Sequence, residues 1–267
     1  MMRLLSFNLN AYGERHGPWS ARRPLVAAML AEQRPDLVAL QAVARDPAIE
    51  SGRDQAAQLA GDVGGYDVVY RPAARDADGR EQGLALLSRV PALAVRVQPL
   101  SRRGDDDPHD RVLLHGLYPA PGGPLHVVCA HLSWVDEQAR DNVDELLAYL
   151  AALAGPTLVL GDFNQTPGSD ALARLVRGGL VDAWSALRPD APGHTFYEAG
   201  ALARRIDYLL LDRRLAPRLR GVSLVLDGPG ERRASDHAGV LALLAMPDER
   251  ADVAPSTRQG FRQRSAR

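Results

Sequence analysis

Polar side chains recur where the apolar runs of this sequence end. Residues 157–160 form an apolar run, Gly161 ends it, and Asp162 and Asn164 follow on the predicted exit loop. Their spacing of two places a carboxylate and a carboxamide on the same side of an extended chain. Taken alone, the pair could form an Asx-turn that closes the strand, or it could belong to a site for chemistry.

The same pattern appears at the ends of several other predicted strands. The residues at those ends are Asn8, Gln41, His131, Asp207, Asp236 and His237. The set contains carboxylates, amides and imidazoles but no thiol. Oxygen ligands suit Mg²⁺ or Mn²⁺, and imidazoles exchange protons near neutral pH. Such a set suits the cleavage of a phosphate ester, in which a cation and hydrogen-bond donors neutralise the phosphoryl oxygens.

Composition excludes several other kinds of protein. A net charge of −1 argues against a protein that holds nucleic acid by bulk electrostatics. The chain has no lysine, which excludes Schiff-base chemistry and phosphate-loop lysines. Cys129 is the only cysteine, so no disulfide can form within the chain, and we expect this residue in the core. The N-terminal apolar run is too short for a signal peptide, and no segment has the length of a membrane span, so we expect a cytoplasmic protein. We also expect a monomer.

The chain is expected to form one α/β domain over residues 1–246, followed by a disordered tail at 247–267 that is rich in Pro, Ser, Gln and Arg. Ser20 is a suitable N-cap for a helix at 21–33, and the apolar spacing in 136–153 predicts an amphipathic helix. Shorter helices are expected near 54–62 and 169–176. Strands are predicted at 2–10, 37–40, 66–70, 83–88, 92–97, 112–118, 125–131, 157–160, 206–211, 222–226 and 238–244. Many strands with two principal helices favour two face-to-face sheets with helices outside.

Residues 2 to about 245 resemble the endonuclease/exonuclease/phosphatase family. The resemblance is carried, in order, by Ser6-Phe7-Asn8, residues 36–41, residues 83–89, His131-Leu132, Gly161-Asp162-Phe163-Asn164, Arg205-Ile206-Asp207-Tyr208 and Ser235-Asp236-His237. It implies a four-layered α/β sandwich, with two packed, mostly antiparallel sheets flanked by helices. It also implies hydrolysis of a phosphoester with the help of Mg²⁺ or Mn²⁺.

The resemblance assigns a role to each matching residue. His237 would be the general base, oriented by Asp207. Asn164 would bind the scissile phosphate, to which His237 also lies close, and Asp162 would orient the attacking water. His131 would contact a phosphate oxygen or protonate the leaving group, and Glu81 is a weaker candidate for the carboxylate that supports it. The metal site would include Asn8 and Asp236.

One departure from the family pattern concerns the metal site itself. The family has a glutamate, its principal metal ligand, directly after the strand that ends in Gln41, and this chain has Ala42. A methyl group cannot coordinate a cation, so activity should fall by ~10²-fold or more. Ala42 is explained either by an engineered change or recent loss, which we favour because the other motifs are intact, or by a natural variant that recruits Asp46 or Glu50.

The substrate stays open at the level of the sequence. His131-Leu132-Ser133-Trp134 is similar to the histidine motif of the deoxyribonuclease, sphingomyelinase and 5-phosphatase branches. The loop 101–110 is acidic and would repel a long polyanion if it bordered the cleft. Residues 194–197 could contact substrate or could be buried structural residues. We expect a small or lipid-like phosphoester first, nucleic acid second, and a catalytically impaired phosphate-binding protein as the third alternative.

Overall fold

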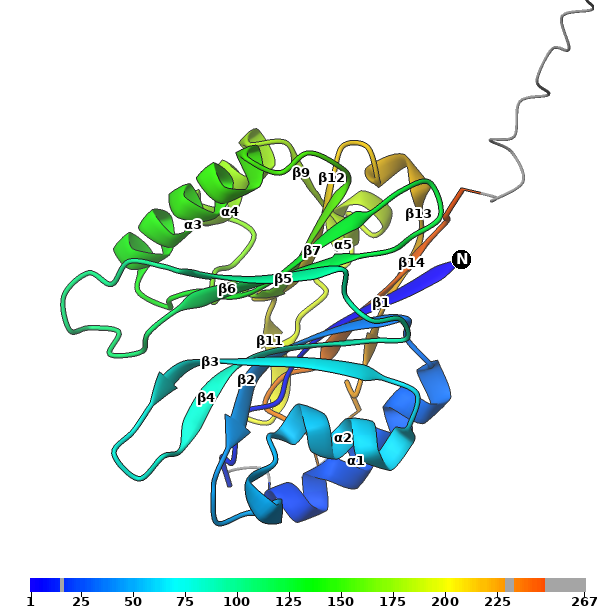
Figure 1. The fold of residues 1–267 in the computed structure, drawn as a ribbon. Coiled ribbons are helices and arrows are strands. Elements are labelled where there is room, and N and C mark those ends of the chain that lie inside the picture. Colours follow the sequence, from blue (N-terminus) through cyan, green and yellow to red (C-terminus); the bar gives the residue numbers. More distant parts are fainter. Residues whose placement is uncertain (15–16, 229–232, 248–267) are drawn as a thin grey trace, which may run out of the picture.

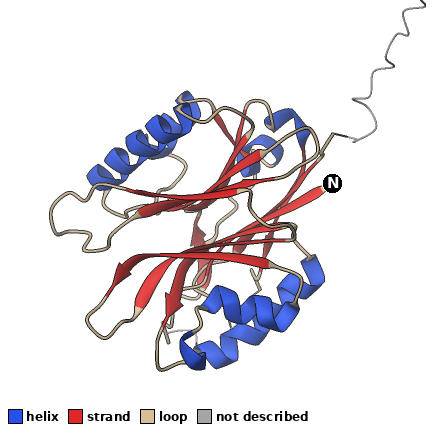
Figure 2. Ribbon diagram, viewed as in Figure 1, coloured by secondary structure: helices blue, strands red, loops and turns tan. Residues whose placement is uncertain are grey.

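Two six-stranded mixed sheets pack face to face in the computed structural model, which describes residues 1–14, 17–228 and 233–247 (Figures 1 and 2). The first sheet has the order β13 (Leu219–Val225), β14 (Gly239–Leu244), β1 (Met2–Asn8), β2 (Leu37–Arg45), β4 (Glu81–Ser88), β3 (Asp67–Arg75). The second has the order β5 (Ala94–Pro99), β6 (Val112–Tyr118), β7 (Leu125–His131), β8 (Thr157–Asp162), β12 (Asp207–Asp212), β9 (Leu180–Asp182). Each sheet contains one parallel pair, β1 with β2 and β7 with β8, and its other pairs are antiparallel. The predicted sandwich is confirmed.

Helices cover both outer faces. The first sheet carries α1 (Trp19–Gln33) and α2 (Gln55–Val63), and the second carries α3 (Asp136–Ala151) and α4 (Asp170–Arg177) (Figure 2). Successive strand residues point to opposite faces, so Leu4 packs between the sheets while Leu5 packs beneath α1. Because both faces of the central strands are buried, these strands are continuously apolar instead of alternating.

The strand pairing brings the predicted polar residues to one edge. Asn8 is paired with Gln41 on the parallel strands β1 and β2, and His131 is paired with Asp162 on β7 and β8. Asp207, the first residue of β12, lies opposite Asp162 on its antiparallel neighbour. Parallel strands end at the same edge of a sheet, and this register therefore gathers their C-terminal side chains.

Several local expectations need correction. The N-cap of α1 is Pro18, not Ser20, which lies within the helix. Strand β1 ends at Asn8, and Asn10 adopts a left-handed conformation (φ 54°) on the loop that follows. The short elements β9, α5 (Ala183–Leu187), β10 (Phe196–Glu198) and β11 (Ala201–Arg204) were not predicted. The predicted tail lies outside the described residues except for Pro247.

None of the helices in the described residues combines the length and the apolar character needed to cross a membrane.

Candidate active site

Asp162, the last residue of β8, is the centre of the polar cluster. Its side chain is buried. The preceding residue, Gly161, allows β8 to pack closely against β7, because a Cβ there would lie 2.0 Å from the carbonyl oxygen of Ala130. Oδ1 of Asp162 accepts the backbone N–H of Asn164 (2.8 Å), which adopts φ 54°. This is the Asx-turn that the sequence allowed. It does not exclude a site, because the other carboxylate oxygen faces the remaining polar residues.

Three side chains approach Oδ2 of Asp162. Nδ2 of Asn8 donates a hydrogen bond to it at 2.9 Å. The Nε2 atoms of His131 and His237 lie 3.4 Å and 3.7 Å away. The structure therefore joins residues from β1, β7, β8 and the segment before β14 around one carboxylate. Asn164 stands beside them, with its Nδ2 donating to the carbonyl of Leu132 (2.9 Å).

His237 is held by Asp207 on its other ring nitrogen. Nδ1 of His237 lies 2.8 Å from Oδ2 of Asp207, and both side chains are buried. A carboxylate at this position keeps the proton on Nδ1 and directs Nε2 towards Asp162. The backbone N–H of His237 donates to Oγ of Ser235 (3.2 Å), which fixes the loop that delivers the imidazole.

Residues 194–197 support this pair. Oγ1 of Thr195 accepts the backbone N–H groups of Ile206 and Asp207, each at 3.1 Å, and so fixes the start of β12. The ring of Phe196 meets that of His237 edge to face, with 5.0 Å between the centroids. These contacts favour the structural alternative for this segment.

The two histidines of this cluster have opposite electrostatic environments. Burial lowers the pKa of His131 to about 3, because the charge of Asp162 only partly offsets desolvation. Burial also opposes charge on His237, but the carboxylates of Asp207 and Asp162 outweigh it and raise its pKa to about 9. Without a cation, His237 is an imidazolium at neutral pH and His131 is a neutral imidazole.

The donor set fits a divalent cation. Asp162, Asp207 and His237 each place one ligand atom within 4.8 Å of the others. Oδ1 of Asp207 is buried and accepts no hydrogen bond from any described residue, so it has an unused lone pair inside the site. The carboxylate oxygens of this set are ligands of the kind that Mg²⁺ and Mn²⁺ prefer. Sequence reasoning gave these three residues catalytic roles and did not single them out as a possible metal set.

The three positions assigned to the metal site occupy different surroundings. Asn8 is in the cluster, although its Oδ1 already accepts the N–H of Asn10 (2.8 Å). Oδ1 of Asp236 lies 3.8 Å from Nε2 of His237. Ala42 lies in a bulge of β2, between Leu40 and Val43, with a left-handed backbone (φ 48°) and a buried side chain.

The other acidic candidates pair with arginines elsewhere. Asp46 contacts Arg80, and Glu50 contacts Arg23 and Arg53. Glu81 contacts Arg75 and Arg45, and Asp162 is the carboxylate beside His131. Glu81 therefore pairs with arginines and does not support His131, in contrast to the expectation from the sequence.

Arg22 is a supporting residue that sequence reasoning missed. It is almost fully buried in α1 and donates hydrogen bonds to four backbone carbonyls, those of Leu9, Ala11, Gly17 and Ala234. Two of these acceptors belong to the loop after Asn8, and Ala234 belongs to the segment just before Asp236. Arg22 thereby ties together two loops that carry site residues. One arginine in a helix gives no sequence signal of this role.

The model of the Endonuclease/Exonuclease/phosphatase family matches residues 5–237. The chain belongs to this family. Its name covers phosphatases and nucleases, whose common reaction is hydrolysis of a phosphoester. No curated protein matches the chain significantly.

Solved structures of the family share the fold. An endonuclease/exonuclease/phosphatase from Beutenbergia cavernae is 24% identical with a TM-score of 0.75, over 90% of this chain and 70% of its own. A mannosyl-6-phosphatase from Bacteroides thetaiotaomicron is 19% identical with a TM-score of 0.75, over 92% of this chain and 100% of its own. A 3′ phosphatase from Neisseria, bound to a product DNA hairpin, is 20% identical with a TM-score of 0.67, over 92% and 100%. At these identities the similarity shows the fold alone.

Proposed function

We propose that this protein belongs to the metal-dependent phosphoester hydrolases of its family, and that its site acts on a small phosphoester. The observation that supports this most directly is the convergence of two buried carboxylates, two imidazoles and two carboxamides at one edge of the sandwich. Burying so many polar groups is costly unless they serve each other or a ligand. Oδ1 of Asp207, which has no partner among the described residues, points to a ligand.

In this proposal His237 accepts the proton of the attacking water through Nε2, and Asp207 holds the ring from Nδ1. Asp162 orients the water, while Asn164 and His131 contact phosphate oxygens. The low pKa of His131 means that it reaches the phosphate as a neutral hydrogen-bond donor at neutral pH.

The raised pKa of His237 sets a condition on this mechanism. A general base must be unprotonated, and the metal-free site holds a proton on His237. Mg²⁺ or Mn²⁺ held by Asp162, Asp207 or Asp236 would add positive charge, which disfavours the imidazolium and stabilises negative charge on the phosphate. The carboxylates thus have two roles, to hold the cation and to set the proton affinity of the base.

Ala42 favours a second candidate function. If position 42 corresponds to the metal-ligand glutamate of the family, the chain retains the groups that contact phosphate and has lost one group that holds the cation. Such a protein would bind a phosphate ester and release it uncut. Nucleic acid stays as an alternative substrate, because the Neisseria 3′ phosphatase is a structural neighbour that binds DNA.

Adding the glutamate tests the proposal. The left-handed backbone at Ala42 already carries a Cβ, so Ala42→Glu should not require a different backbone conformation. We expect the variant to hydrolyse bis-p-nitrophenyl phosphate or mannose 6-phosphate in the presence of Mn²⁺ at least ~10²-fold faster than the parent. Equal rates for parent and variant, with phosphate binding retained, would favour the binding-protein alternative.

A further inference from the structure

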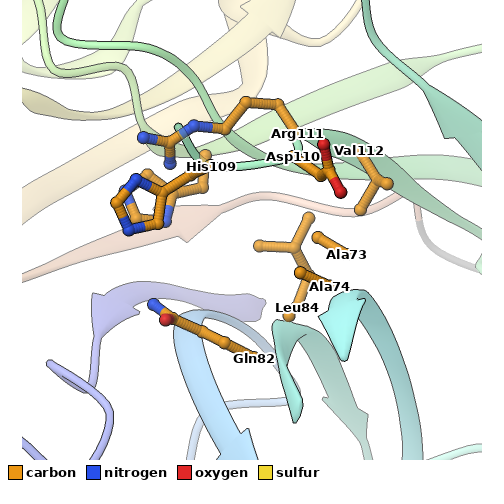
Figure 3. A pocket seen from close by; sticks show the side chains of 10 residues that line it. Ala73, Ala74, Gln82, Leu84, His109, Asp110, Arg111 and Val112 are labelled. Atoms are coloured by element: carbon orange, nitrogen blue, oxygen red, sulfur yellow. The ribbon is translucent and has the colours of Figure 1, made fainter. Parts of the chain in front are cut away.

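A small pocket opens beside His131, between the two sheets (Figure 3). Gln82 and Leu84 reach it from β4, and residues 109–112, which lead into β6, face them from the other sheet. Its volume is about 50 Å³. About 10–15 Å³ of such space is enough for one water molecule, so the pocket has room for a small substituent of a substrate. The proposed mechanism uses only His131 among the residues that line it.

Asp107 organises the loop on one side of this pocket. Its buried carboxylate accepts hydrogen bonds from Nε and Nη2 of Arg111 (3.1 and 3.0 Å) and from the backbone N–H of His109 (3.1 Å), whose Nδ1 lies 3.0 Å away. Burial raises the pKa of Asp107, but the hydrogen bond from Ser133 and the charge of Arg111 outweigh it and keep the pKa low. A buried, fully hydrogen-bonded carboxylate holds a surface loop in one conformation, and a binding site needs supports that are preorganised in this way.

Trp134 completes a ring-sized surface next to the pocket. The guanidinium of Arg111 lies over its indole, 5.2 Å from the centroid, and the ring of His109 meets it edge to face at 5.1 Å. Nevertheless 46% of Trp134 is exposed, in contrast to the buried Trp19 and Trp184. Arg111 thus covers one face of an indole that is fixed only three residues beyond His131.

We propose that His109, Arg111 and Trp134 form a subsite for the organic part of the substrate, and that this part is a ring with an apolar face, as in a sugar phosphate or a nucleoside monophosphate. This proposal rests on the proposed function, because the phosphate must lie at His131. The ring stacks on Trp134, a substituent enters the pocket, and Nη1 of Arg111, which bonds to no described residue, donates to a ring oxygen or hydroxyl.

The charges of the same loop disfavour a long nucleic acid. Asp105, Asp106 and Asp110 are exposed beside the subsite, and Asp110 lies 3.8 Å from Arg102. A single phosphate at His131 would lie near the positive charge of Arg111, which is close enough to lower the pKa of His131. Further phosphates along a polynucleotide would meet these carboxylates and be repelled.

Calorimetric titration of the whole chain tests the subsite without requiring turnover. The ligands are inorganic phosphate, glycerol 3-phosphate, glucose 6-phosphate, adenosine 5′-monophosphate and a single-stranded oligonucleotide, each with Mn²⁺. The variants are Trp134→Ala, Trp134→Phe as the conservative replacement, and Val176→Ala as a matched change at an exposed apolar residue (53%) at the end of α4. We expect one or both ring esters to bind more tightly than glycerol 3-phosphate.

Trp134→Ala should weaken the binding of the preferred ring ester by about 10-fold or more, leave inorganic phosphate within about twofold, and be largely rescued by Trp134→Phe. Preference for the hexose or for the nucleotide identifies the kind of ring. Equal binding of cyclic and acyclic esters, with no effect of Trp134→Ala, would refute the subsite and leave the phosphate site standing. If the oligonucleotide bound most tightly, the subsite would also be wrong. Failure of every ligand, inorganic phosphate included, would overturn the proposed function together with the subsite.

Discussion

Replacing Asp207 with asparagine should lower the pKa of His237. The pKa of His237 is raised to about 9, and the charge of Asp207 is the largest favourable cause after the unfavourable effect of burial. Asparagine keeps an acceptor near Nδ1, 2.8 Å away in the parent, but removes the charge. A hydrogen bond to a charged partner is worth about 1.5–3 kcal/mol and one between neutral groups about 0.5–1.5 kcal/mol, so the change removes about 1–1.5 kcal/mol. Because 1.36 kcal/mol corresponds to one pKa unit, the pKa of His237 should fall by about one unit, to about 8.

Nuclear magnetic resonance of the imidazoles in metal-free protein measures this shift. The chain has 7 histidines, and the signal of His237 can be assigned by its loss in His237→Gln. Asp236→Asn is the matched control, because Asp236 is partly exposed and its carboxylate lies 3.8 Å from Nε2. It should lower the pKa less than Asp207→Asn does. If His237 still titrated near 9 in Asp207→Asn, its charge would not depend on Asp207, and the assigned orienting role would be wrong.

Three further predictions concern stability. Ala42→Gly should stabilise the fold by up to about 1 kcal/mol in urea unfolding, because Ala42 has a left-handed φ of 48° that glycine adopts without strain. Ala39→Gly, in the extended part of β2, should destabilise the fold. If both variants were less stable than the parent, backbone strain at the bulge would be contradicted. Arg22→Met should cost about 3 kcal/mol or more, because four backbone carbonyls in two buried and two partly buried hydrogen bonds lose their donor. Arg23→Met on the same helix should cost less than about 1 kcal/mol. Similar losses would mean that Arg22 does not tie the loops together. Burial lowers the pKa of His115 from 6.5 to about 4, so the unfolded chain binds a proton at a higher pH than the folded chain does. The free energy of unfolding should therefore fall, by up to about 3 kcal/mol, as the pH decreases from 6.5 to 4. His115→Gln should show a smaller fall over that interval, and an equal fall would refute this assignment.

The sequence predicted the sandwich because its central strands are long and apolar and because its motifs lie in the family order. Strand ends were also predictable: Asn8, His131 and Asp162 follow apolar runs, and strand pairing gathers such ends at one edge. The short strands β9, β10 and β11 were not predictable, because three or four residues carry too little periodicity. The N-cap of α1 was misplaced because Pro18 provides no side-chain hydrogen bond that a pattern could reveal.

Supporting residues were harder to predict than the residues they support. Thr195 fixes Asp207 through backbone groups that are 11 and 12 residues away, and Arg22 bonds to Ala234, 212 residues away. Such contacts depend on tertiary packing and leave no local pattern. Asp107 belongs to the acidic loop 101–110, and its burial, which the sequence does not reveal, distinguishes it from Asp105 and Asp106. The pKa of His131 is lowered and that of His237 is raised, and this difference likewise depends on which carboxylates face each ring.

The most direct test of the proposed function is the Mn²⁺-dependent release of phosphate by the Ala42→Glu variant, with and without the added change His237→Gln. We predict turnover that requires the cation in Ala42→Glu and a loss of at least ~10²-fold in the double variant, with both proteins folded by circular dichroism. Glutamine can still donate a hydrogen bond to Asp207, so the fold should be retained. Turnover that is unchanged without His237, or that does not require the cation, would contradict the central claim that this cluster is a metal-dependent hydrolytic site.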